Sequence, residues 1–137
     1  MKLLVERFYR EVWNHRLEAV AHDILVPDFS FRGSLGEERK GVEAFLDYAR
    51  SVHEALQDYR CTINEIVVEG ERAAARMNFS GIHVGEFYGV AGTGREISWS
   101  GAAFFVARSR RLSALWVLGD IDAIKAQLGA NACSQFR

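Results

Sequence analysis

Apolar side chains recur every three or four positions along the first 56 residues, with charged side chains between them. This period places the apolar residues on one face of a helix. The pattern predicts three helices, over residues 2–14, 17–25 and 41–56. Pro27 is expected to end the second helix, because a proline disfavours helical geometry in the residue before it. A short strand over 29–31 and a loop over 33–36 are predicted to follow.

Beyond residue 56 the apolar positions alternate with polar ones, which is the period of a β-strand. Long strands are predicted over 59–68, 72–84, 96–107 and 112–120, a glycine-rich loop over 85–94, and a short helix over 121–128. Helices first and antiparallel strands afterwards are typical of the α+β class. We therefore expect one domain over residues 1–129, followed by a tail over 130–137. The domain is predicted to be a cone-shaped, strongly curved, mostly antiparallel sheet with helices over its concave face and a pocket between them.

Composition narrows the class of protein. The chain has 137 residues, 49% of them hydrophobic and 26% charged, as in an ordered globular domain. Its formal net charge of −1 lacks the basic excess of a nucleic-acid binder. Charges interrupt the apolar start at Glu6 and Arg7, and no apolar run is long enough to span a bilayer. Two cysteines, Cys61 and Cys133, without metal or redox spacing favour a cytoplasmic location.

The sequence contains none of several motifs that bind cofactors or metals. Gly89, Gly92 and Gly94 lack the spacing of a dinucleotide or phosphate loop, and the four histidines lack metal-ligand spacing. No serine nucleophile elbow occurs either. We therefore expect no cofactor and no metal.

Strand alternation indicates where a carboxylate could act. Residues 112, 114, 116, 118 and 120 share one face of the last strand, so Asp120 is expected beside Trp116. If Ser109 and Arg110 form a two-residue turn, Asp120 lies opposite Trp99 on the preceding strand, and His83 is expected close by. A carboxylate in an apolar setting has a raised pKa and a neighbouring imidazolium lowers it, so Asp120 and His83 could transfer protons.

Each of these residues also has a purely structural interpretation. Asp120 directly precedes the predicted final helix, where its side chain can cap the first turn. His83 beside a glycine-rich loop can serve as a structural hydrogen-bonding group. Large rings such as Trp99 and Trp116 are core residues by default. These alternatives stay open at the level of sequence.

Several short segments together resemble one known family. They are Val5 to Tyr9 with Trp13-Asn14, Phe29 to Gly36, Gly81 to Phe87 with Thr93 to Arg95, and Trp116 to Asp120. In this order, over about residues 3–129, they resemble the SnoaL-like polyketide cyclases of the nuclear transport factor 2-like superfamily. The resemblance implies a cystatin-like α+β cone, usually oligomeric and without cofactor or metal. It also implies that an aspartate at the end of the last long strand, which Asp120 matches, acts as general acid/base in an intramolecular aldol ring closure.

The chain departs from the family at one point: residues 101–107 contain no supporting histidine, and His83 is expected to substitute in part. We predict a cofactor-free cyclase or isomerase acting on a small hydrophobic carbonyl compound, with Asp120 as general acid/base and His83 as hydrogen-bond donor. The predicted substrate-binding residues are Trp99, Trp116, Tyr9, Trp13, Phe31 and Tyr88. The alternative is a non-catalytic small-molecule binding or accessory domain of the same fold.

The face of the last two strands turned away from the helices is also apolar. It is predicted to carry Ala102, Phe104, Val106, Leu115 and Val117. Such a surface is too apolar to leave in water. We therefore expect a homodimer packed sheet to sheet, and neither nucleic acid nor a membrane as a partner.

Overall fold

The helices of the computed structural model, which describes residues 1–33 and 37–129, lie where the apolar period predicts them. They are α1 (Lys2–Arg7), the π-helix η1 (Phe8–Asn14) that continues it, α2 (Glu18–Ile24), α3 (Val42–Ala55) and α4 (Ile121–Gln127). The predicted tail over 130–137 and most of the predicted loop over 33–36 lie outside the described residues.

The strands form one mixed sheet. They are β1 (Leu25–Arg32), β2 (Glu38–Lys40), β3 (Leu56–Glu69), β4 (Arg72–His83), β5 (Glu96–Arg108) and β6 (Arg111–Gly119), in the order β2-β1-β6-β5-β4-β3. All neighbours are antiparallel except β1 and β6, which run parallel. The predicted α+β class and the four long strands are confirmed, whereas β2 and the parallel pairing were not predicted.

Pro27 does not end a helix, as the sequence suggested, but lies inside β1. Helix α2 already ends at Ile24. The proline is tolerated because β1 pairs with β2 only from Ser30 onward, and its pairing with β6 is irregular between Leu25 and Ser30. The sheet therefore needs no backbone N–H at that position, and proline, which lacks one, is accommodated.

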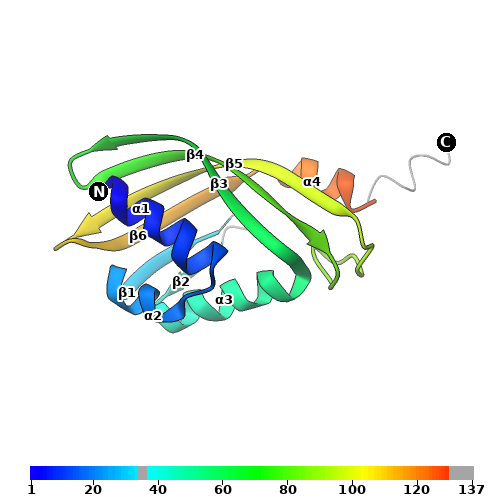
Figure 1. Ribbon diagram of the computed structural model, residues 1–137, viewed down its shortest axis with the longest axis horizontal. Helices are drawn as coiled ribbons and strands as arrows, with labels where there is room; N and C mark the ends of the chain where they lie inside the picture. Colours follow the sequence, from blue (N-terminus) through cyan, green and yellow to red (C-terminus); the bar gives the residue numbers. More distant parts are fainter. Residues whose placement is uncertain (34–36, 130–137) are drawn as a thin grey trace.

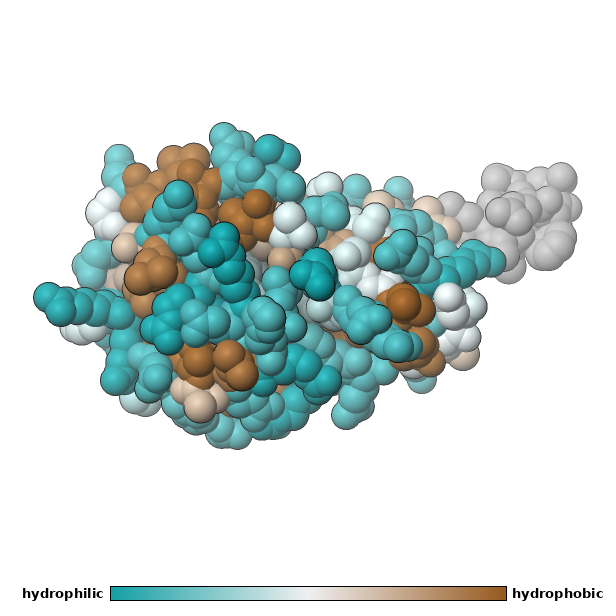
Figure 2. All heavy atoms as spheres, in the orientation of Figure 1, coloured by the Kyte–Doolittle hydropathy of each residue, from teal (hydrophilic) through white to brown (hydrophobic). Residues whose placement is uncertain are grey.

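The helices of the first half of the chain lie along one side of the curved sheet, and α4 lies near its far end (Figure 1). Between the two layers, Phe8 is fully buried and contacts the rings of Phe29, Phe45 and Phe105. Seen in the same direction, the surface is mostly hydrophilic, with apolar side chains in separate small groups (Figure 2). Among the described residues no helix is long and apolar enough to cross a membrane.

A β-bulge in β6 decides which of its side chains face the helices. The turn at Ser109 and Arg110 has two residues, both with positive φ, as expected. The register then shifts: Ala107 pairs with Leu112, but Val106 pairs with Ala114, so Ser113 is an extra residue. One extra residue turns every later side chain to the opposite face.

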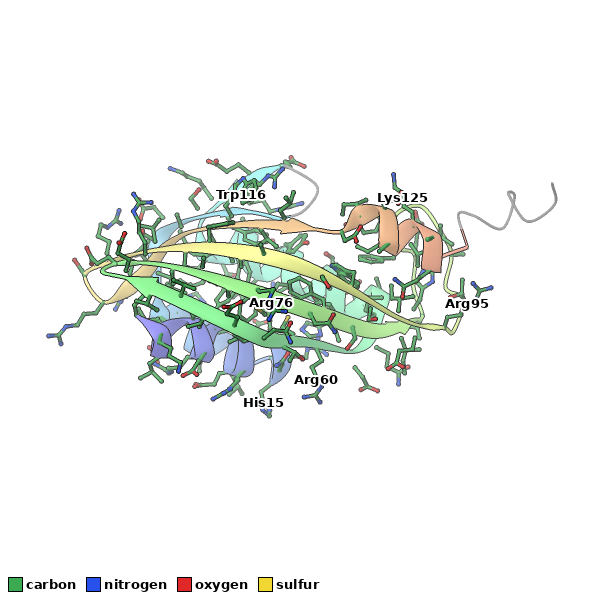
Figure 3. All side chains as sticks on the ribbon, turned by 90° about the horizontal axis from the view of Figure 1, so that it is seen from above. His15, Arg60, Arg76, Arg95, Trp116 and Lys125 are labelled. Carbon is green, nitrogen blue, oxygen red and sulfur yellow. The ribbon has the colours of Figure 1, made fainter. Side chains whose placement is uncertain are left out.

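As a result Leu115 and Val117 are buried, whereas Trp116 and Leu118 face outward with exposed fractions of 42% and 51%. Together with Phe104, which is 50% exposed, they form the outer apolar patch. The rings of Phe104 and Trp116 lie 5.8 Å apart, and the guanidinium of Arg32 lies 4.7 Å from the Trp116 ring. Figure 3 looks toward this side of the sheet. The prediction that Leu115 and Val117 face outward is thus wrong because of the bulge.

Candidate functional site

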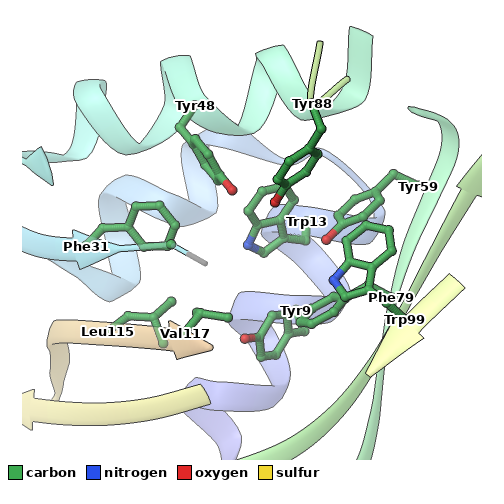
Figure 4. A pocket seen from close by; sticks show the side chains of 11 residues that line it. Tyr9, Trp13, Phe31, Tyr48, Tyr59, Phe79, Tyr88, Trp99, Leu115 and Val117 are labelled. Atoms are coloured by element: carbon green, nitrogen blue, oxygen red, sulfur yellow. The ribbon is translucent and has the colours of Figure 1, made fainter. Parts of the chain in front are cut away.

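An aromatic cavity lies between the helices and the inner face of the sheet (Figure 4). The space in which the centre of a water-sized molecule fits is about 40 Å³. Side chains from η1, α3 and five of the strands contribute to its wall. The residues that line it are Tyr9, Trp13, Phe31, Gly33, Tyr48, Tyr59, Phe79, Tyr88, Trp99, Leu115 and Val117.

The π-helix η1 supplies two of these side chains, Tyr9 and Trp13. The amide of His15 donates to the carbonyl oxygen of Arg10 at 3.0 Å, five residues earlier, as in a π-helix. The end of η1 is fixed to β3 by Asn14. Its side-chain amide donates to the carbonyl oxygen of Cys61 at 2.9 Å, and its carbonyl oxygen accepts from the Cys61 N–H at 2.7 Å. This pair of hydrogen bonds holds the end of η1, and with it the Trp13 backbone, against the sheet.

The opposite wall is built from paired positions on β4 and β5. Phe79 lies directly opposite Trp99, and their rings are 5.6 Å apart. Gly101 leaves room for Phe79, since a Cβ at this position would lie 2.8 Å from the phenylalanine ring. Gly33 similarly leaves room for Tyr48, whose hydroxyl would lie 3.1 Å from an added Cβ. Glycines therefore allow large rings to reach the cavity from two sides.

The polar tips of the lining rings point into the cavity. Figure 4 shows the hydroxyls of Tyr9, Tyr48 and Tyr88 turned toward the open space, with the indole nitrogens of Trp13 and Trp99 facing the same way. Tyr9 is 2% exposed, and its hydroxyl has no hydrogen-bond partner among the described residues. A buried hydroxyl without a partner is costly, so one that faces a cavity indicates a place for a ligand oxygen or for water.

Burial keeps these hydroxyls protonated. It raises the pKa of Tyr9 and of Tyr59 well above the usual value for a phenol, and it raises the pKa of Tyr88 to about 12. Burial also raises the pKa of Tyr48, although the positive charge of Arg39 opposes this effect. At neutral pH the tyrosines of the cavity wall are thus available as hydrogen-bond donors and are too weakly acidic to act as phenolates.

Asp120 does not reach the cavity. Its side chain is exposed and accepts a hydrogen bond from the N–H of Ala123 at 3.0 Å, which makes it the N-cap of α4. Its own N–H donates to the carbonyl oxygen of Ser100 at 3.0 Å, so it does not lie opposite Trp99 as predicted. The bulge at Ser113 is the physical reason, since it reverses the alternation on which the prediction rested. The structural interpretation of Asp120 is the one that the geometry bears out.

His83 is fully buried but holds a loop together and does not line the cavity. Its Nδ1 accepts from the N–H of Thr93 at 3.2 Å, so its Nε2–H donates to the carbonyl oxygen of Val90 at 3.0 Å. Both ring nitrogens are occupied, and the prediction that His83 donates to a substrate oxygen has no support here. The loop that it holds, residues 84–95, carries Tyr88 into the cavity wall.

Five of the six predicted substrate-binding residues do line the cavity: Tyr9, Trp13, Phe31, Tyr88 and Trp99. The sixth, Trp116, lies on the outer face of the sheet instead. The sequence analysis missed Tyr48 and Tyr59. Tyr48 lies three residues after the buried Phe45 on α3, and Tyr59 shares a strand face with the buried Cys61, so both spacings could have identified them.

His53 lies behind the cavity wall. Its ring centre is 5.8 Å from those of Trp13 and Tyr59, and its Nε2 is buried without a partner among the described residues. Burial lowers the pKa of His53, so the neutral imidazole is favoured. It does not line the cavity. Over the described parts of the chain, no three His, Cys, Asp or Glu side chains gather in a way that could hold a metal ion.

The curved sheet, the helices across it and the cavity between them define a nuclear transport factor 2-like α+β cone. The chain belongs to the SnoaL-like polyketide cyclase family, whose family model matches residues 3–128. No protein among the curated sequences matches it.

Solved structures resemble the chain over most of its length. A candidate SnoaL-like polyketide cyclase from Jannaschia sp. CCS1 has a TM-score of 0.85 at 18% identity, covering 93% of this chain and 90% of its own. TsrD from Streptomyces laurentii has a TM-score of 0.83 at 28% identity, with 94% of each chain covered. A protein with a ketosteroid isomerase-like fold from Catenulispora acidiphila, in complex with trimethylamine, has a TM-score of 0.77 at 12% identity, with 92% of each covered.

Proposed function

We propose that the protein binds a planar, carbonyl-bearing small molecule in the aromatic cavity and polarises its carbonyl group with the hydroxyl of Tyr9. The observation that carries this proposal is the buried Tyr9 hydroxyl, which faces the cavity without a partner among the described residues. Membership of a polyketide cyclase family supports a substrate of this kind. The reaction is then a cofactor-free enolisation that leads to ring closure or isomerisation.

The chemistry follows from what the cavity wall offers. When a proton leaves the carbon next to a carbonyl group, negative charge develops on the carbonyl oxygen. A fixed hydrogen-bond donor in a water-poor site stabilises that charge more than it stabilises the neutral substrate, and so lowers the barrier. Tyr9 has the required position and stays protonated. Tyr48 and the indole N–H of Trp99 face the same space and can hold further oxygens of the substrate.

Removal of the proton requires a base, and the residues that line the described cavity include no carboxylate and no imidazole. The family resemblance assigns this role to Asp120, and the assignment stays a prediction. Because Asp120 is exposed, caps α4 and lies outside the cavity lining, it would act as a base only if the chain after Gly119 rearranged. Without such a rearrangement, hydroxide or a buffer base that enters from solvent would have to accept the proton, because neutral water is too weak a base for a carbon acid.

The size of the cavity implies that binding requires movement. A space of about 40 Å³ holds a few water molecules, whereas a fused-ring substrate needs several times as much. The 84–95 loop is a wall segment that lies outside the helices and long strands, and it contributes Tyr88. We expect the part of this loop around Tyr88 to move outward when a ligand enters. His83 should keep Val90 and Thr93 of the loop attached to β4.

The second candidate is a binding protein without catalytic activity. The absence of a carboxylate or imidazole from the described lining favours it, since a binding site needs only the aromatic walls and the donors. Both candidates require the same cavity, so the presence of a ligand does not distinguish them. They differ in whether a bound carbonyl compound loses its α-proton faster than in buffer.

Exchange of α-hydrogen for deuterium tests the proposal without knowledge of the natural substrate. 1-Tetralone has one carbonyl group on a two-ring frame, and tetralin has the same frame without oxygen. We expect 1-tetralone to raise the melting temperature more than tetralin does, and its α-hydrogens to exchange faster with the protein than in matched buffer. Tyr9→Phe should reduce both effects. Equal shifts for the two compounds would show the proposal to be wrong, and binding without faster exchange would establish the binding protein.

We further propose that the chain forms a homodimer in the cytoplasm. Apolar side chains of the outer apolar patch are poorly accommodated in water, and Cys61 is a free, buried thiol, as suits a reducing compartment. The patch lies on the face of the sheet opposite the cavity, so a partner seated there would leave the cavity free.

A further inference from the structure

We infer that the natural ligand carries a negative charge, and that the guanidinium of Arg39 selects for it. This inference rests on the proposed function, because it concerns the ligand of the same cavity. The ligand class is a planar aromatic compound with a carboxylate group at one end. Arg39 is a specificity-determining residue in this account, and the rings of the cavity wall supply the remaining affinity.

The position of Arg39 carries the inference. Arg39 lies on β2 directly opposite Phe31 of β1, and Phe31 lines the cavity. Its guanidinium carbon lies 5.2 Å from the centre of the Tyr48 ring, and Tyr48 also lines the cavity. Arg39 is therefore in contact with the cavity wall on the side where β2 and α3 meet, and it is only partly exposed.

The charge of Arg39 is not neutralised within the described residues. Arg39 forms no ion pair or hydrogen bond there, whereas other arginines of the chain are paired with carboxylates: Arg7, Arg50, Arg76 and Arg108. The adjacent Glu38 lies opposite Arg32, and side chains alternate along a strand, so Glu38 and Arg39 point to opposite faces of β2. Arg39 does not itself line the cavity, but its guanidinium lies against the Tyr48 ring of the cavity wall and is unpaired within the described residues, so a ligand anion that reaches past this ring could pair with it.

The interior of the cavity suits an anion as well. The tyrosine hydroxyls and indole N–H groups are donors, and the described lining contains no carboxylate that would repel a negative ligand. The field of Arg39 reaches the cavity, because it lowers the pKa of the Tyr48 hydroxyl against the larger effect of burial. A guanidinium also matches a carboxylate with two parallel hydrogen bonds, which an uncharged ligand group cannot reproduce.

Two ligands of the same shape test the inference. 2-Naphthoate carries the carboxylate, and 2-naphthamide replaces it with a neutral amide. Binding can be followed by quenching of the fluorescence of Trp13 and Trp99, which line the cavity. We expect the protein to bind 2-naphthoate about tenfold more tightly than 2-naphthamide, as a hydrogen bond to a charged group predicts. Arg39→Gln should abolish this preference, because it should weaken the binding of 2-naphthoate far more than that of 2-naphthamide.

Arg60→Gln is the matched control, because it removes the same charge from an exposed position on β3. It should keep the preference for 2-naphthoate, and Arg39→Lys should keep part of it. The preference should weaken as salt is added, since a partly exposed charge is screened. Circular dichroism of each variant establishes that it is folded.

The outcomes separate the inference from the proposed function. If 2-naphthamide binds as tightly as 2-naphthoate, or if Arg39→Gln retains the preference, Arg39 does not select anions and the inference is overturned. Binding of 1-tetralone together with faster exchange of its α-hydrogens would leave the proposed function intact in either case. If 1-tetralone and both naphthalene derivatives fail to bind, the proposed function is wrong and the inference is wrong with it.

Discussion

Replacing Tyr9 with phenylalanine should affect stability and function in opposite directions. The change removes one hydroxyl and keeps the ring, whose edge-on contacts with Phe8 and Phe105 have ring centres 5.1 and 5.8 Å away. The hydroxyl is buried and lacks a partner among the described residues. It also faces an existing cavity, so its loss opens no new void in a packed region. Tyr9→Phe is therefore a clean deletion of one polar group.

The expected size of each effect follows from the cost of an unsatisfied hydroxyl. A buried polar group without a partner costs about 1–3 kcal/mol, and a water in the cavity would offset much of that cost. We expect Tyr9→Phe to raise the free energy of unfolding by up to about 1 kcal/mol. Loss of a donor to a neutral carbonyl should weaken ligand binding by about two- to tenfold. Loss of a donor to a developing enolate should slow turnover by about 10²–10³-fold.

Urea denaturation followed by circular dichroism measures the first effect, and the deuterium exchange of 1-tetralone measures the second. Leu112→Ala is a useful control, because Leu112 is fully buried, does not line the cavity and should lose stability without a specific loss of exchange. If Tyr9→Phe lowers the free energy of unfolding by more than about 1 kcal/mol and leaves exchange unchanged, the hydroxyl is structural and the reasoning is refuted.

Four further predictions concern other parts of the molecule. Asp120→Asn should keep stability and exchange activity, whereas Asp120→Ala should lower the free energy of unfolding by about 1 kcal/mol in urea denaturation; a hundredfold loss of exchange in Asp120→Asn would instead identify Asp120 as the base. His83→Ala should speed hydrogen exchange of the amides in the 84–95 loop, because the hydrogen bonds of the His83 ring to Val90 and Thr93 are lost; unchanged exchange rates there would contradict this role. Stability should fall as the pH rises above about 10, because burial makes the pKa of Tyr9 and Tyr59 higher in the folded state than in the unfolded state. Their contribution to stability is complete below the unfolded pKa and is lost as the pH rises toward the folded pKa. Urea titrations at pH 8 to 11 test the sign. Trp116→Glu should convert the proposed dimer to a monomer in light scattering, and a wild-type monomer at micromolar concentration would rule the dimer out.

The sequence predicted the elements well because each is long enough to show its period. Helix α3 places Phe45, Ala49 and Val52 on one buried face, and four of the strands are at least nine residues long. The three residues of β2 are too few to show any period, and their pairing depends on β1. A parallel pairing between β1 and β6 joins parts of the chain that no local pattern relates.

The candidate site was predicted in part for the same reason. Tyr9 and Trp13 lie on the buried face of the first helical segment, so their place in the wall followed from spacing. Asp120 and Trp116 depended on unbroken alternation along a strand, and one extra residue at Ser113 invalidated both placements. No feature of the sequence near Ser113 marks the bulge, because serine is equally acceptable in a regular strand. The segment Trp116 to Asp120 matches the family in sequence, but Trp116 and Leu118 face the outer side of the sheet and not the cavity.

The side-chain amides of Asn14 and Gln127 hold the ends of η1 and α4 against the sheet, and they also affect which backbone groups the sheet leaves unpaired. Gln127 receives the N–H of Ser98 at 2.9 Å and donates to the Ser98 carbonyl oxygen at 2.6 Å, as Asn14 does for Cys61 on the other side of the sheet. Each amide thus occupies a peptide group that β5 or β3 would otherwise present to an incoming strand. Loss of either side chain would leave that peptide group without its partner and open to pairing with another strand.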